Sequence, residues 1–156
     1  MLKIDIPGFK KIEVEHLVLD FNGTIAIDGL FIEGVIGQLV QVSAHLNVHV
    51  LTADTFGTVE KELKALPITI KILEPAGQDQ QKLRYIKDLG SSRVIAIGNG
   101  KNDLLMLRES ALSIGIIQAE GAYSQILCDT QVICTNINDA LSLLINPKRL
   151  FATLRN

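Results

Sequence analysis

Asp20 is the first residue of this sequence whose type and position could do chemistry. It ends the apolar run His16-Leu17-Val18-Leu19 and is followed by Phe21-Asn22-Gly23-Thr24, which contains a turn-forming Asn-Gly pair. An apolar run that stops at such a pair is typical of a buried strand that delivers its last side chain to the end of a sheet. A carboxylate there can act as a nucleophile or bind a hard cation. The pentapeptide by itself fits a plain Asx-turn equally well.

Two further residues could hold a phosphate group. Thr52 ends the run Val48–Leu51, and its hydroxyl, with backbone N–H groups from Ala53 onward, could bind phosphate oxygens at the start of the next helix. Lys82 lies near the start of a later helix and could neutralise charge that would otherwise repel an attacking carboxylate. Lys71 and Lys101 compete with Lys82 for this role.

The stretch Gly98-Asn99-Gly100-Lys101-Asn102-Asp103 follows another β-branched run, Arg93–Ile97. Oxygen donors such as the Asp103 carboxylate are the ligands that Mg²⁺ prefers. Together with Asp20, Thr52 and Lys82, this stretch suits a phosphate bound beside a divalent cation.

These residues belong to elements that alternate along the chain. Strands are expected at residues 16–20, 48–51, 68–72, 93–97, 111–117 and 131–134, and helices at 33–45, 55–66, 78–89, 103–110, 120–127 and 137–144. Asp54 or Thr55 would cap the second of these helices, and Gln78 or Asp79 the third. We also expect two hairpins, one at 3–14 at an edge and one at 25–32 beside Asp20.

This alternation predicts an α/β fold: a three-layer, doubly wound, mostly parallel, Rossmann-like sheet with small β-hairpins. Ligands of such sheets bind outside the carboxyl ends of the strands. Three of the expected strands end at Asp20, at Thr52 and at Gly98-Asn99. The candidate residues should therefore meet at one edge of the sheet.

Size and composition limit the alternatives. With 156 residues, 47% of them hydrophobic, we expect one domain over residues 1–156. No apolar run approaches the roughly 20 residues that cross a bilayer, and the N-terminus lacks the features of a secretory signal. We therefore expect a soluble cytoplasmic protein without a membrane partner. A formal charge of −2 gives no reason to expect nucleic-acid binding.

In this order, the motifs resemble those of the haloacid dehalogenase (HAD) superfamily of phosphotransferases. Asp20–Thr24 matches the first motif, Thr52 the second, Lys82 the third and Gly98–Asp103 the fourth, over a region of about residues 14 to 146. The Gly-x-Gly-x-Asn-Asp form of the fourth motif is also similar to the phosphorylation domain of P-type ion pumps.

The resemblance implies a role for each matched residue. Asp20 would be the nucleophile that forms an aspartyl-phosphate. The implied phosphate-binding residues are Thr52, Ala53 and Lys82. The implied Mg²⁺ ligands are Asp20, Asn22 through its backbone carbonyl, Asn99 and Asp103, and Asn102 would orient the metal-binding loop.

The sequence leaves no room for a cap domain. Residues 25–51 are taken up by a hairpin, a helix and a strand, and residues 53–81 by a helix, a strand and the start of the next helix. We expect an open site for a small phosphorylated substrate. Capless relatives often cover such a site by forming homo-oligomers, which is what the resemblance implies here.

Two asparagines depart from the family pattern. Asn22 stands where phosphatases of this family carry an aspartate that protonates the leaving group and activates water, and its loss commonly costs about 10²- to 10⁴-fold in rate. Asn99 stands where an aspartate usually binds the metal, so Mg²⁺ affinity should fall. Both precede glycine, a context in which asparagine can deamidate, so aged protein could acquire the two missing acids.

Three functions remain open. The leading prediction is a slow Mg²⁺-dependent phosphatase or phosphotransferase acting through Asp20. The rival is a non-catalytic or regulatory module that keeps a phosphate site, which Asn22 and Asn99 favour. A persistent phosphoenzyme used in phosphotransfer is the third.

Overall fold

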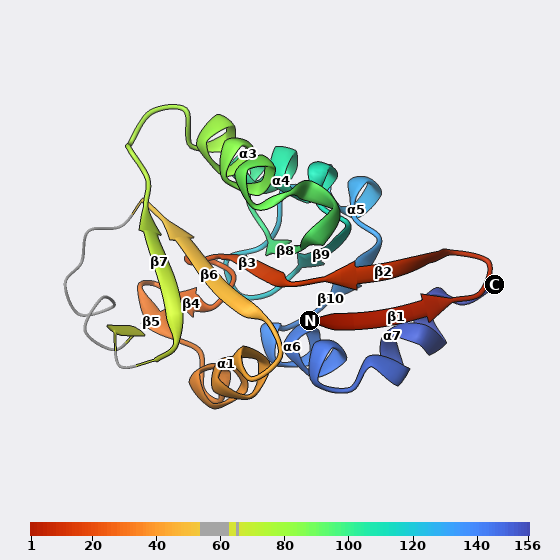
Figure 1. The fold of residues 1–156 in the computed structure, drawn as a ribbon. Coiled ribbons are helices and arrows are strands. Elements are labelled where there is room, and N and C mark those ends of the chain that lie inside the picture. The colour runs from red at the N-terminus through yellow and green to blue at the C-terminus, as the bar shows by residue number, and fades with distance from the viewer. Residues whose placement is uncertain (54–62, 65) are drawn as a thin grey trace.

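The computed structural model describes residues 1–53, 63–64 and 66–156, and its centre is a parallel sheet (Figure 1). Its strands are β3 (His16–Asp20), β6 (Asn47–Thr52), β7 (Ile68–Ile72), β8 (Val94–Gly98), β9 (Leu112–Ile116) and β10 (Val132–Cys134). They lie in the order β10-β9-β8-β3-β6-β7, and every neighbouring pair is parallel. The predicted α/β sheet is confirmed, and all six of its strands run in one direction.

Helices cover both faces of this sheet. They are α1 (Val35–Ser43), α3 (Gln78–Leu89), α4 (Leu104–Glu109), α5 (Ile126–Asp129), α6 (Ile137–Ile145) and α7 (Pro147–Leu154), with short 3-10 turns at Ser91–Arg93 and Lys101–Asp103. In Figure 1, α3, α4 and α5 lie on one side of the sheet, and α1, α6 and α7 on the other. The three-layer architecture is therefore as predicted.

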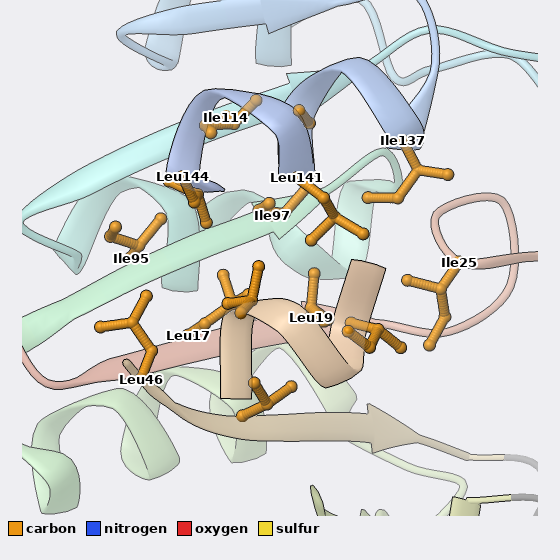
Figure 2. Packing of buried hydrophobic residues seen from close by; sticks show 14 of the residues in the cluster. Leu17, Leu19, Ile25, Leu46, Ile95, Ile97, Ile114, Ile137, Leu141 and Leu144 are labelled. Carbon is orange, nitrogen blue, oxygen red and sulfur yellow. The ribbon is translucent and has the colours of Figure 1, made fainter. Parts of the chain in front are cut away.

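The central strand β3 is buried because helices pack on both of its faces. Leu17 and Leu19 point into the core under α1 and α6, whereas Val18 joins the core under α3 and α4. Figure 2 shows Leu17 and Leu19 facing Leu141 and other residues of α6. A strand buried on both faces reads as a continuous apolar run, which is why this segment was visible in the sequence. Asp20 is its last residue.

Both predicted hairpins form. β1 (Leu2–Ile6) pairs with β2 (Lys10–Val14), and β4 (Ala26–Ile27) pairs with β5 (Leu30–Phe31). The turn of the second hairpin has positive φ at Asp28 and Gly29, 50° and 77°, which suits its Asp-Gly sequence. The predicted edge position of the first hairpin is wrong, because its strands form a separate two-stranded sheet.

Some helix boundaries differ from the prediction. The helix expected at 120–127 is wrong: α5 begins only at Ile126, because Gly121 has a φ of 75° and the backbone N–H of Tyr123 donates to the carbonyl of Asn99. The N-cap of α3 is Gly77, so neither Gln78 nor Asp79 holds that position.

The two remaining segments are the C-terminal tail and the helix predicted at 55–66. The C-terminal tail forms α7, which was not predicted as a helix, and its Leu150 is fully buried. The helix predicted at 55–66, with its cap at Asp54 or Thr55, lies largely outside the described residues; within it, only residues 63, 64 and 66 are described. In the described part of the chain, no helix combines the length and the apolar character needed to span a membrane.

Candidate active site

A cavity of about 260 Å³ opens at the carboxyl ends of β3, β6 and β8. It is lined by Asp20, Asn22, Thr52, Ala53, Gln78, Lys82, Asn99, Gly100, Asn102 and Glu120. Parallel strands place their carboxyl ends at one edge of a sheet, which brings three segments that are far apart in sequence to the same cavity. Seven of the eight residues predicted for the site line it, and the eighth, Asp103, is fully buried beside it.

Lys82 joins the two carboxylates of the site. Its Nζ donates to Asp20 Oδ1 at 2.5 Å and to Asp103 Oδ1 at 2.6 Å. The Lys82 side chain is only 1% exposed, and α3 positions it against the end of β3. A buried ammonium group is tolerated only when it is paired and hydrogen-bonded, and two acceptors meet that condition.

The two lysines that competed with Lys82 lie elsewhere. Lys71 is exposed on the edge strand β7, and Lys101 is exposed on the loop after β8. Of these three lysines, Lys82 is the one that contacts Asp20.

Both carboxylate oxygens of Asp103 accept hydrogen bonds from other groups of the protein. Oδ1 accepts from Lys82, and Oδ2 accepts from the backbone N–H groups of Asn99 at 3.0 Å and Gly100 at 2.8 Å. Its side chain packs against Gly98, where an added Cβ would lie 2.6 Å from Asp103 Cγ. Asp103 thus holds both Lys82 and the loop after β8.

Burial and charge change the protonation of Asp20 and Lys82. Desolvation, reinforced by the charge of Asp103, raises the pKa of Asp20 to about 7, although Lys82 opposes this effect. Burial alone would lower the pKa of Lys82, but the charges of Asp103 and Asp20 raise that pKa above its ordinary value. Lys82 therefore stays charged at neutral pH.

Thr24 and Gly23 connect the Asp20 turn to Asn99. The Thr24 hydroxyl lies 3.3 Å from Asp20 Oδ2 and 3.2 Å from Asn99 Oδ1, so its single hydrogen is shared between two acceptors. Gly23 has a φ of 76°, and a Cβ built on it would lie 2.2 Å from Asn99 Nδ2. Only glycine allows the turn and the Asn99 side chain to approach this closely.

Sequence reasoning missed two residues that line the cavity, Gln78 and Glu120. Gln78 Oε1 accepts from Asn102 Nδ2 at 2.9 Å, so it fixes the amide that was expected to orient the loop. Glu120 is exposed, and its Oε1 accepts from the backbone N–H of Asp28 at 2.9 Å. Glu120 was missed because residues 120–127 were predicted to be a helix. The signal that could have found it is its place after β9, since the loop after β9 lies at the same edge of the sheet as the loop after β8.

The oxygen donors at the cavity suit a Mg²⁺ ion that is bound by few protein ligands. Asp20 is the aspartate that lines it, Asn99 and Asn22 supply amide or backbone oxygens, and Asp103 is engaged elsewhere. Within the described ranges, no group of three or more His, Cys, Asp or Glu side chains is placed to hold a metal ion. Mg²⁺ commonly keeps several waters and takes one or two carboxylates plus substrate phosphates, so the residues present fit such an ion.

Two histidines and a tyrosine form a hydrogen-bonded chain on the α3 side of the sheet. His16 Nδ1 lies 3.0 Å from His49 Nε2, and His49 Nδ1 lies 3.0 Å from the Tyr85 hydroxyl. Burial, together with the nearby charge of His16, lowers the pKa of His49 to about 4. The pair is therefore neutral at pH 7 and serves to satisfy buried polar atoms.

Solved structures of similar architecture cover nearly the whole chain. The cobalt-bound deoxy-D-mannose-octulosonate 8-phosphate phosphatase (YrbI) of Haemophilus influenzae superposes with a TM-score of 0.69 at 11% identity, over 92% of this chain and 94% of that one. The 3-deoxy-D-manno-octulosonate 8-phosphate phosphatase of Moraxella catarrhalis, in complex with magnesium ion, phosphate ion and KDO, gives a TM-score of 0.67 at 18% identity, over 89% and 90%. A Streptomyces avermitilis protein assigned to the HAD family of hydrolases gives 0.62 at 16%, over 85% and 83%.

The chain has the haloacid dehalogenase fold. The resemblance indicated by the four motifs is thus confirmed for the fold, and among the described residues nothing forms a separate cap on the HAD core.

One sequence relative shows the family to which the chain belongs. It belongs to the same family as the uncharacterized protein MJ0073 of Methanocaldococcus jannaschii, with 42% identity over 79 residues, which are 48% of this chain and 85% of MJ0073. No family model matches the sequence.

Proposed function

We propose that this protein is a Mg²⁺-dependent phosphatase or phosphotransferase that acts through an aspartyl-phosphate on Asp20, with slow turnover. The observation that carries the proposal is the buried Lys82, held between Asp20 and Asp103 at a cavity that opens on the carboxyl end of β3. Removing an ammonium group from water is costly. Its position beside Asp20 is the one needed to offset the charge of a phosphate group.

In the first step, a carboxylate oxygen of Asp20 attacks phosphorus. The bond between phosphorus and the leaving oxygen breaks, and its electron pair departs with that oxygen. Lys82, the Thr52 hydroxyl and the Ala53 backbone N–H would hold the phosphoryl oxygens, because all three residues line the cavity. Mg²⁺, when bound to Asp20, the Asn22 carbonyl and Asn99, would reduce the negative charge on the phosphate.

Asp103 and Asn102 would act by positioning other groups. Asp103 holds Lys82 and the backbone of Asn99 and Gly100, whereas Asn102 is held by Gln78. The predicted role of Asp103 as a direct metal ligand stays a prediction. Both of its oxygens already accept hydrogen bonds within the protein, which favours the positioning role.

The second step would be slow. Water must attack the phosphorus of the aspartyl-phosphate, which breaks the bond to Asp20, releases inorganic phosphate and restores the carboxylate. Asn22 lines the cavity but cannot accept the proton of that water. The phosphoenzyme should therefore persist and could pass its phosphoryl group to another acceptor.

The relatives support a small phosphorylated substrate. The superposed enzymes from Haemophilus influenzae and Moraxella catarrhalis are named as phosphatases of an octulosonate 8-phosphate. For this chain we propose only the same chemical class of substrate, a small phosphate ester. We also propose that the chain forms a homo-oligomer in which a neighbouring subunit covers the uncapped site. The kinship to P-type ion pumps rests on the form of the fourth motif alone.

A non-catalytic, phosphate-binding module is the second candidate. Asn22 and Asn99 favour it, because each replaces a carboxylate of the family pattern at a position that lines the cavity. The intact group of Asp20, Lys82 and Asp103 favours the enzyme.

One experiment separates these candidates. Wild type and Asp20→Asn are incubated with acetyl phosphate and Mg²⁺, and intact mass and phosphate release are followed. The enzyme proposal requires one added phosphoryl group in wild type and none in Asp20→Asn. Absence of both phosphoprotein and phosphate release in wild type would leave the binding module.

A further inference from the structure

A second cavity of about 540 Å³ adjoins the candidate active site. Much of its lining is apolar and includes Pro75, Leu104, Leu105 and Tyr123. Asp79 and Lys101 also line it and bring opposite charges, so the formal charge of its lining is zero. A cavity with these walls suits an uncharged, flat, apolar group.

The two cavities share a wall. Gln78 and Asn102 line both of them, and the hydrogen bond between their amides keeps this pair in place. A phosphoryl group bound at Asp20 would occupy the smaller cavity, and a substituent on that group would then lie next to the larger cavity at the shared Gln78–Asn102 pair. The larger cavity therefore lies where the leaving group of a phosphate ester could bind.

Asn22 restricts which leaving groups can depart. Without a proton donor at this position, the leaving oxygen must depart as an anion and take a proton from the solvent afterwards. A phenolic hydroxyl has a pKa of about 10, whereas a hydroxyl with the pKa of water, about 16, leaves far less readily as an anion. An aromatic hydroxyl is thus the leaving group that this site handles best.

We infer that the substrates are aryl phosphates, that is, phosphate monoesters of an aromatic hydroxyl group. The ring occupies the cavity beside Tyr123 and Leu105 while the phosphoryl group lies at Asp20. In the transfer step, the bond between phosphorus and the aryl oxygen breaks, and the phenolate leaves with the electron pair. This inference rests on the proposed function, because it names the substrate class of the same site.

Binding of non-hydrolysable phosphonates tests the cavity separately from turnover. Calorimetry with Mg²⁺ compares phenylphosphonate with methylphosphonate on the wild-type protein. We expect phenylphosphonate to bind about tenfold more tightly, which is the effect of burying one face of a ring. Equal affinities would overturn the inference, and failure of both ligands to bind would count against the proposed phosphate site itself.

Substitutions place the effect in the cavity. Leu105→Gln should bring the ratio of the two affinities close to one, whereas Tyr123→Phe, which keeps the ring, should preserve the ratio. Leu127→Gln is the matched control, because Leu127 is 50% exposed on α5 and is not part of the cavity lining. An unchanged ratio in Leu105→Gln would mean that the ring binds elsewhere and would overturn the assignment.

Reaction rates test the preference for an aromatic leaving group separately from binding. Phosphoenzyme formation is compared for phenyl phosphate, glycerol phosphate and acetyl phosphate. Acetyl phosphate reports on the proposed function alone, because it carries no ring. We expect phenyl phosphate to react at least tenfold faster than glycerol phosphate. Equal rates for phenyl phosphate and glycerol phosphate in the wild type would overturn this step. If the rate with glycerol phosphate then falls in Glu120→Gln, Glu120, which also lines the site, is the proton donor.

Discussion

Lys82 and Asp20 are 62 residues apart in the sequence, yet Lys82 Nζ lies 2.5 Å from Asp20 Oδ1. Helix α3 and strand β3 bring them together, and both side chains are buried.

Lys82→Met should destabilise the protein strongly. It removes the cation that pairs with Asp20 and Asp103 and leaves two buried carboxylates facing each other. Removing one partner of a buried ion pair commonly lowers the free energy of unfolding by about 3–5 kcal/mol. Urea unfolding at pH 7.5 measures the change. Lys87→Met, an exposed substitution of the same type on α3, should stay within about 0.5 kcal/mol of wild type; equal effects of the two variants would contradict the structure.

Gly23→Ala and Gly29→Ala form a matched pair. The two glycines have φ values of 76° and 77°, but only the Gly23 position would bring a Cβ against Asn99, whereas nothing lies within 4 Å of a Cβ at Gly29. Gly29→Ala should cost about 1 kcal/mol for the backbone alone. Gly23→Ala should cost more and should also weaken phosphoenzyme formation, because Asn99 must move. Similar losses of stability in both variants would show that the contact with Asn99 is unimportant.

Asn22→Asp should supply the missing acid and base. The residue lines the cavity, so a carboxyl group there could transfer a proton to and from the reacting groups. Phosphate release from glycerol phosphate should rise by about 10²-fold or more, and the phosphoenzyme should become short-lived. Asn22→Asp combined with Asp20→Asn is the control and should form no phosphoenzyme. A double variant as active as Asn22→Asp would exclude Asp20 as the nucleophile.

The raised pKa of Asp20 predicts how stability depends on pH without metal. The folded protein keeps the Asp20 proton up to about pH 7, whereas the unfolded chain releases it near the ordinary value of 3.8. Between these values the folded state binds more protons, so this group makes stability fall as pH rises, and above about pH 7 its effect is constant. Asp20→Asn should therefore gain stability relative to wild type from about pH 4 to about pH 7.

Urea unfolding in EDTA across this range gives the difference between Asp20→Asn and wild type. The difference is needed because His49, whose pKa is lowered to about 4, makes stability rise with pH over part of the same window. Asp88→Asn, which changes an exposed carboxylate of α3, is the control. A pH-independent difference for Asp20→Asn would show that its carboxyl titrates alike in both states.

The two Asn-Gly pairs should age differently. Deamidation requires the glycine nitrogen to attack the asparagine side chain. Both glycine N–H groups are hydrogen-bonded, that of Gly23 to the Ala26 carbonyl and that of Gly100 to Asp103. The Asn99 amide is in addition held by Thr24 and Gly121. Asn22 is exposed, so peptide mapping of aged protein should find conversion at Asn22 ahead of Asn99. Conversion at Asn99 first would contradict the observed packing.

The sequence alone singles out Asn22 as the residue predicted to limit turnover, because motif spacing around Asp20 is local. Glu120 was not recognisable, because its segment carried a helical pattern. A glycine with positive φ and the hydrogen bond from Tyr123 to Asn99 hold that segment as a loop instead. In this segment the long-range contact, and not the local helical pattern, determines the backbone conformation.

By itself, the sequence determined that strands end at Asp20, at Thr52 and at Gly98, since an apolar run and its interruption depend only on neighbouring residues. The motif order already favoured Lys82 over Lys71 and Lys101, but only the tertiary structure placed Lys82 against Asp20 and turned Asp103 toward that lysine. Only the structure also revealed the larger cavity beside the site. The physical reason is that the packing of α3 and α4 against the sheet brings distant residues together, and no local pattern records which residues will meet.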